Sequence, residues 1–212
     1  MAVNIHTNTR RQAQGQGVCA AYQISRQQTP TEKRERARLQ GEVMTPEWMV
    51  DDMMTALDAC DTSLSASPIS NPDVPLLDMC GGTGNFTLSV AEHRARSAGK
   101  PADAIRNVRM IELDEDNIDI ARQRCMLALR DAYGELTAAD EIEARHILEK
   151  NFICGDALRA SDVMSPDKCR VIVSNPPYPR STAYSGDAVR RKTAEGTSVL
   201  AAVLGRSCGG KP

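Results

Sequence analysis

The sequence lacks three features that would assign it to a specialised class of protein. No uninterrupted apolar run approaches the roughly 18 residues needed to cross a bilayer, and the N-terminus carries Arg10-Arg11 instead of the apolar core of a signal peptide. The seven cysteines form no CxxC pair and the three histidines stand far apart, which argues against a zinc site or a disulfide framework. We therefore expect a cytoplasmic protein with reduced, mostly buried cysteines, no metal and no membrane segment.

The sequence also lacks a strong net charge. With a net charge of −2 over 212 residues, the whole chain lacks the strong positive charge that would attract nucleic acid without further contacts. The ends are basic, however: residues 1–40 carry six Arg and one Lys against two Glu, and residues 180–212 carry four Arg and two Lys against one Asp and one Glu. We expect 1–40 to be a flexible basic segment with little fixed structure and 180–212 an irregular basic tail, although TEKRERARLQ (31–40) could form a polar helix.

Residues 41–179 have the pattern of one α/β domain, which opens with a helix. Thr45 can cap this helix and Pro46 suits its first position, while Met44 and Met49 have the spacing of a hydrophobic staple. The residues expected to share its apolar face are Met49, Val50, Met53, Met54 and Leu57. A linker rich in Ser, Pro, Asn and Asp follows at 61–73.

Beyond the linker, strand and helix patterns alternate. Strands are expected at 74–80, 108–113, 151–158 and 169–174, helices at 86–96, 115–132 and 137–150, an inserted loop at 97–107 and a short crossover at 161–168. The second helix carries Ile118, Ala121, Cys125 and Leu129 at helical spacing. Continuous apolar strands between helices predict a Rossmann-like fold, with a parallel sheet and helices on both faces.

Three strand ends carry candidate ligand-binding residues. In DMCGGTGNF (78–86), glycines remove side chains that would block a ligand, although a tight strand-to-helix connection explains them equally well. Glu112 ends the second strand, where a carboxylate can accept both hydroxyls of a ribose, unless it is only a solvated strand end. Asp156 could accept a hydrogen bond from an adenine amino group, or could be a turn aspartate.

The fourth strand runs into Asn175-Pro176-Pro177-Tyr178, which is harder to explain as a simple turn. Asn175 supplies a side-chain carbonyl, the proline peptide a backbone carbonyl, and Tyr178 a flat ring. Two acceptors can take the two hydrogens of a planar amine while the ring stacks on the attached base or amide. We therefore interpret this segment as a site for an amine substrate.

Taken in order, MTPEWMV, DMCGGTGNF, IELD, ICGDAL and VSNPPY resemble the motifs of S-adenosylmethionine-dependent amino-methyltransferases. The resemblance is greatest to the enzymes that methylate the N-6 amino group of adenine in DNA, and it covers about Met44 to Tyr178. It implies a substrate adenine that leaves the duplex stack before reaction. The cofactor-binding residues that it implies are Thr45, Pro46, Asp78, Cys80, Gly81, Gly82, Gly84, Phe86, Glu112 and Asp156, and the catalytic ones are Asn175, Pro176, Pro177 and Tyr178.

Members of that family continue past this motif through three more strands and a target-recognition region, whereas 34 residues follow Tyr178 here. Three strands with two crossovers do not fit into that length. We therefore expect the C-terminal strands to be missing, and either a partner chain or self-association to cover the exposed sheet edge, or little activity.

Three functions remain open. The first is an adenine-specific DNA methyltransferase of a modification system, or only the cofactor-binding half of one, which MTPEWMV favours. The second is a methyltransferase acting on a protein glutamine amide or on RNA, because NPPY suits any planar amine. The third is a noncatalytic cofactor-binding or assembly subunit.

Overall fold

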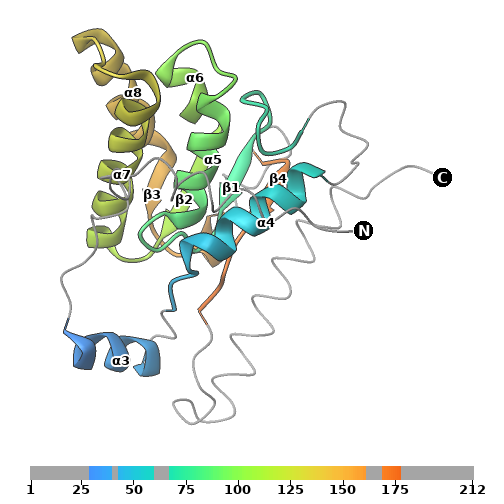
Figure 1. Cartoon of the computed structure of the whole chain (residues 1–212). Coiled ribbons are helices and arrows are strands. Elements are labelled where there is room, and N and C mark those ends of the chain that lie inside the picture. The colour runs from blue at the N-terminus through green and yellow to red at the C-terminus, as the bar shows by residue number, and fades with distance from the viewer. Residues whose placement is uncertain (1–28, 40–42, 60–66, 161–168, 178–212) are drawn as a thin grey trace, which may run out of the picture.

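A computed structural model describes residues 29–39, 43–59, 67–160 and 169–177 (Figure 1). Tyr178, the expected crossover at 161–168 and the expected tail at 180–212 lie outside the described residues. The elements are α3 (Pro30–Leu39), α4 (Glu47–Ala59), β1 (Leu76–Asp78), α5 (Asn85–Ala95), α6 (Pro101–Ile105), β2 (Val108–Glu112), α7 (Glu115–Tyr133), α8 (Ala138–Asn151), β3 (Phe152–Cys154), the 3-10 helix η1 (Ala157–Arg159) and β4 (Val171–Val173).

The four strands form one parallel sheet in the order β3-β2-β1-β4, which confirms the predicted α/β, Rossmann-like fold. The chain moves from β1 outward to β2 and β3, and then returns to place β4 on the other side of β1. In open parallel sheets, ligands bind beyond the carboxyl ends of the strands at such a reversal. Asp78 pairs with Val173, so the ends of β1 and β4 open onto the same crevice.

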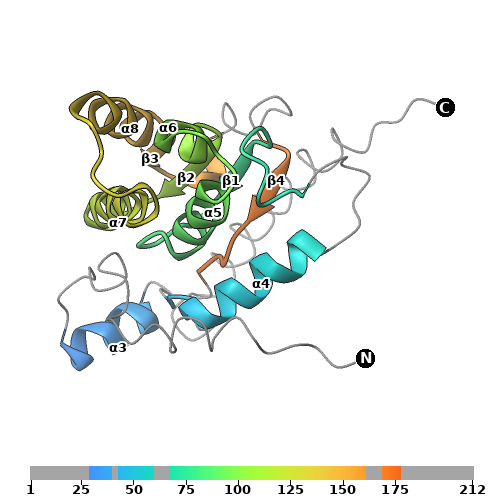
Figure 2. The same ribbon diagram turned by 45° about the horizontal axis from the view of Figure 1, so that its top comes forward.

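One face of the sheet is covered by the long helices, which Figure 2 shows gathered beside the strands. α4 and α5 bury one apolar cluster that reaches Val173 of β4, and α6, α7 and α8 bury a second around Met110 and Phe152. On the opposite face, where helices were also predicted, the only helical element among the described residues that packs on Leu77 and Ile111 is the short η1, through Ala157. None of the helices in the described part of the chain is both long and apolar enough to span a membrane.

The predicted apolar face of α7 is confirmed, since Ile118, Ala121, Cys125 and Leu129 are all buried. This helix begins after Asp114, whose side chain accepts a hydrogen bond from the Asp116 backbone N–H. Such a cap satisfies a donor that the first helical turn would leave unpaired. The sheet-to-helix transition is therefore encoded locally.

The apolar face of α4 is narrower than predicted. Val50 and Met54 are buried and Leu57 is partly buried, whereas Met49 and Met53 are 38% and 41% exposed. The helix also begins at Glu47 rather than Pro46, whose carbonyl accepts the Val50 N–H. A stripe of five apolar residues is wider than the surface that α5 and the sheet offer to this helix.

One helix forms where a polar helix was considered possible, at 31–40, and another where a loop was expected. α3 forms because Thr29 and Glu32 make a capping box: the Glu32 N–H reaches the Thr29 hydroxyl at 3.3 Å, and the Thr29 N–H reaches Glu32 Oε2 at 2.7 Å. The expected loop at 97–107 contains α6, which starts at Pro101 and buries Ile105. Of the four described cysteines only Cys125 is buried, whereas Cys80 and Cys169 are half-buried and Cys154 is exposed, so the expectation of mostly buried cysteines is wrong for these residues.

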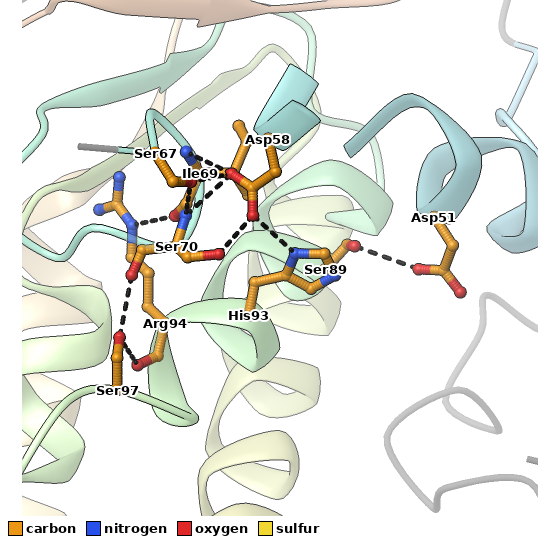
Figure 3. A network of polar contacts seen from close by, with 9 residues as sticks. All are labelled: Asp51, Asp58, Ser67, Ile69, Ser70, Ser89, His93, Arg94 and Ser97. Atoms are coloured by element: carbon orange, nitrogen blue, oxygen red, sulfur yellow. Dashed lines mark hydrogen bonds and ion pairs between the residues drawn. The ribbon is translucent and has the colours of Figure 1, made fainter. Parts of the chain in front are cut away.

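At the amino end of β1, a polar network ties α4 and the turn at 67–75 to α5 (Figure 3). The Asp58 carboxylate accepts hydrogen bonds from the hydroxyls of Ser67 and Ser70 and from the Ile69 and Ser70 backbone amides. The fully buried Arg94 donates to the backbone carbonyl of Ile69 at 3.0 Å. This network lies at the opposite end of β1 from the crevice and fixes where the strand begins.

Candidate active site

Three separate parts of the sequence meet in one hollow at the carboxyl ends of β1 and β4. Of the predicted site residues, Thr45, Cys80, Gly81, Gly82, Phe86 and Asn175 line it. Val43, Met44 and Asn85 line it as well and were missed by the sequence reading. The hollow therefore joins the start of α4, the glycine turn and the residues after β4.

Asn175 is half-buried and connects the segment after β4 with the segment before α4. Its Nδ2 donates to the Val43 carbonyl at 3.2 Å and to the Thr45 Oγ1 at 3.0 Å. Pro176 and Pro177 follow it and are exposed. The stacking partner expected at Tyr178 lies outside the described residues.

The glycines of the turn are required by packing beneath it. A Cβ on Gly81 would overlap the Met110 side chain, and one on Gly84, which has φ +85°, would lie 2.8 Å from the Ala121 Cβ. Gly82 also has a left-handed φ of +54°, and a Cβ there would lie 2.8 Å from the Met44 Sδ. Close packing of the turn on β2 and α7 thus accounts for Gly81 and Gly84 without a ligand.

Asp78, at the end of β1, is a buried carboxyl group with no hydrogen-bond partner of good geometry among the described residues. Burial raises the pKa of Asp78 to about 8; the nearby Cys80 backbone amide lowers it and the Glu112 charge raises it. A buried carboxyl group without a partner is costly. The position therefore favours a ligand that carries a hydrogen-bond donor or a positive charge.

Glu112 ties the end of β2 to the glycine turn. Its Oε2 accepts the Gly82 N–H at 2.8 Å, and its Oε1 accepts the Asp114 N–H at 3.1 Å. It is half-buried and keeps further lone pairs, so it can accept hydroxyl groups from a ligand near the turn. The structure thus gives this residue a role that a solvated strand end would not have.

The predicted cofactor-binding residues that do not line the hollow are Pro46, Asp78, Gly84, Glu112 and Asp156. Asp156 is exposed and caps η1, where its Oδ1 accepts the Leu158 N–H at 3.0 Å, which is the turn-aspartate role. Pro46 is exposed, and its carbonyl accepts hydrogen bonds from the first turn of α4.

Burial raises the pKa of Cys80, which lines the hollow, to about 11, so its side chain is a neutral thiol at pH 7.

Sequence reasoning also missed Arg124, which lies on α7 behind the glycine turn and is 3% exposed. It donates to the Thr83 carbonyl at 2.8 Å and to the Asn85 Oδ1 at 2.6 Å, and it forms an ion pair with Glu47 at 3.3 Å. The signal available in the sequence was its place between Ala121 and Cys125 on the buried side of the helix. A charged residue at such a position needs partners within the fold.

The hollow is small as it stands. Its cavity volume is about 30 Å³, far below the roughly 300–1,000 Å³ of a typical ligand pocket. Met44 contributes to this, because its sulfur lies over Gly82 and 4.0 Å from the Thr83 hydroxyl. A nucleoside-sized ligand would have to displace this flexible side chain.

Comparison of the chain with protein-family models, with curated proteins and with solved structures gave no match. The functional assignment therefore rests on the fold, the motifs and the site geometry.

Proposed function

We propose that the chain transfers a methyl group from S-adenosylmethionine to the exocyclic amino group of adenine in DNA. The observation that carries the proposal is the meeting of Asn175 with Thr45 and the glycine turn in one hollow at the sheet's reversal. A hollow with convergent polar groups at the carboxyl ends of parallel strands is the first place to expect a ligand in such a fold.

The residues present fit the cofactor in hydrogen bonding. Asp78 offers an unpaired carboxyl group to an ammonium, Glu112 offers acceptors to ribose hydroxyls, and the backbone at Gly81 and Gly82 borders the hollow. When bound, S-adenosylmethionine supplies an electrophilic methyl group on a sulfonium. Because Met44 rests on Gly82, cofactor entry requires that side chain to rotate outward.

On the substrate side, the chain would hold the amine by its two hydrogens. Asn175 Oδ1 and the backbone carbonyl of Pro176 are the proposed acceptors, and the ring of Tyr178 is the proposed stacking surface. Hydrogen bonds to both hydrogens of the amine withdraw the nitrogen lone pair from conjugation with the adenine ring and direct it toward the methyl donor. Alignment of the two reacting atoms would then supply most of the rate, and no strong base is required.

The experiment is to incubate the full chain with methyl-labelled S-adenosylmethionine and with adenine-containing DNA, and to analyse the hydrolysed DNA by mass spectrometry. Wild-type protein should form N-6-methyladenine, and Asn175→Ala should form at least 100-fold less, a loss of the kind seen when a transition-state contact is removed. Asn71→Ala, at the opposite end of β1, is the matched control and should behave as wild type. Equal activity of wild type and Asn175→Ala would refute the proposal.

The same assay separates the nearest enzymatic rival. Label on a glutamine amide of added protein, or on RNA, with none on DNA would assign the site to that substrate instead. The segment MTPEWMV, in which Thr45 contacts Asn175, supports the DNA enzyme, because the family resemblance implies such a motif ahead of the glycine turn in that group.

A noncatalytic cofactor-binding or assembly subunit is favoured by one observation. Within the described residues β4 pairs with β1 alone, and Ile172 at this edge is 37% exposed. An uncovered edge strand can add a strand from another chain. We propose that a partner chain or a second copy covers it, which light scattering after gel filtration would test: a monomer active on DNA by itself would contradict the proposal.

A further inference from the structure

The contacts around Asn175 determine which way its side-chain amide faces. The Val43 backbone carbonyl can only accept a hydrogen bond, so the Asn175 atom 3.2 Å away must be the nitrogen. The second hydrogen of that nitrogen is taken by the Thr45 Oγ1 at 3.0 Å. Both donors are used, and the carbonyl oxygen Oδ1 is the group left to meet a ligand.

The residue that supplies this second acceptor is itself held in place. The Asn85 Nδ2 donates to the Thr45 backbone carbonyl at 2.7 Å, and the Asn85 Oδ1 accepts from Arg124 at 2.6 Å. Arginine can only donate and a backbone carbonyl can only accept, so the orientation of Asn85 is also determined at both ends. A chain of hydrogen bonds thus runs from the buried Arg124 through Asn85 and Thr45 to Asn175.

We propose that Thr45 is a positioning residue that, with the Val43 carbonyl, orients the amide of Asn175 so that its oxygen faces the substrate amine. In the flipped orientation an NH₂ group would face an NH₂ group, and neither could accept. The catalytic consequence rests on the proposed function, whereas the amide orientation does not. This role differs from the cofactor contact that the family resemblance implies for Thr45.

The orientation is tested first in the protein alone, by NMR of the ¹⁵N-labelled full chain. The side-chain NH₂ signals of Asn175 are assigned by their absence in Asn175→Asp. Thr45→Val removes the hydroxyl acceptor at nearly constant volume, and Thr45→Ser keeps it. Thr137→Val makes the same exchange at the start of α8, where the hydroxyl accepts the Asp140 N–H, and is the control for loss of a helix-capping threonine hydroxyl elsewhere in the fold.

We expect the Asn175 NH₂ signals to move upfield and their hydrogen exchange to accelerate in Thr45→Val, because one proton loses its acceptor. Thr45→Ser and Thr137→Val should keep the wild-type signals. Unchanged signals in Thr45→Val, with the fold intact by its backbone spectrum, would overturn the proposal.

The kinetic arm separates positioning from cofactor binding. Thr45→Val should lower kcat about two- to tenfold, the range set by loss of one neutral hydrogen bond, with S-adenosylhomocysteine affinity by calorimetry within twofold of wild type. Thr45→Ser should recover most of kcat. Weakened S-adenosylhomocysteine binding with unchanged kcat would overturn the proposal and assign Thr45 to the cofactor. If the wild type transfers no methyl group, the proposed function fails and the NMR result alone decides the orientation.

Discussion

Replacing Asp78 by Asn should remove the pH dependence of stability that this buried group imposes. Asp78 is fully buried at the end of β1, and its pKa is raised from 3.8 to about 8, chiefly by burial. Asparagine has nearly the same shape and does not titrate. The exchange therefore removes the proton linkage while the turn above it keeps its packing.

The sign and size follow from the two pKa values. Below about pH 4 the group is protonated in both the folded and the unfolded chain, and its ionisation costs nothing. Between pH 4 and 8 only the unfolded state releases the proton, so stability falls as pH rises, by about 1.4 kcal/mol per pH unit. The loss levels off above the folded pKa of about 8 and totals roughly 6 kcal/mol.

The assay is urea unfolding of wild type and Asp78→Asn at pH 5, 6, 7, 8 and 9. The free energy of unfolding of the variant minus that of wild type should increase with pH up to about pH 8 and then stay constant. A difference that does not change with pH would refute the assignment of Asp78 as a buried, unpaired acid.

Asp58→Asn is the control of opposite sign. Burial raises the pKa of Asp58, but hydrogen bonds from Ser67, Ser70 and the Ile69 amide outweigh it and leave the pKa lowered. The stability from these contacts is present above the unfolded pKa and is lost as pH falls through the folded one. The Asp58→Asn difference should therefore stay constant between pH 8 and 9, above the range in which a histidine such as the neighbouring His93 changes charge, and shrink in acid.

Two further variants test how the turn is supported. Arg124→Met should lower the free energy of unfolding by about 3 kcal/mol, because the Thr83 carbonyl and the Asn85 Oδ1 lose a charged donor. The control Arg122→Met, at a half-exposed residue, should lower it by about 1 kcal/mol. Equal losses in urea unfolding would contradict the role of Arg124 in supporting the turn. Gly84→Ala should lower the free energy of unfolding by about 2–4 kcal/mol, because of the left-handed φ and the clash with α7. Gly99→Ala, with open space around it, should change the free energy of unfolding by less than about 0.5 kcal/mol. Comparable losses in the two variants would show that the turn tolerates a side chain.

Much of the architecture was predictable because the strands are short apolar runs bounded by turn residues. The approximate positions of all four strands follow from these runs, the face of α7 from its helical spacing, and the parallel sheet from the alternation of strands with helices. The capping box of Thr29 and Glu32 is a further local signal in the sequence, which marks the start of the helix considered possible at 31–40.

The parts of the site that escaped prediction depend on tertiary contacts. Nothing in a single sequence pairs Asn175 with Thr45, 130 positions earlier, or brings Arg124 to Asn85. Likewise, the exposure of Met49 depends on how much surface the sheet offers to α4. Residue type and spacing could indicate which side chains bind a ligand, but not which side chains hold them in place.

The central claim is that the hollow joining the glycine turn to Asn175 is a cofactor site. The most direct measurement is an NMR titration of the ¹⁵N-labelled chain with S-adenosylhomocysteine. We predict saturable shifts of the Gly82 and Asp114 backbone amides and of the Asn175 side-chain amide, with the Ser70 amide at the opposite end of β1 unmoved. Shifts confined to that opposite end, or no shifts at millimolar ligand, would contradict the account.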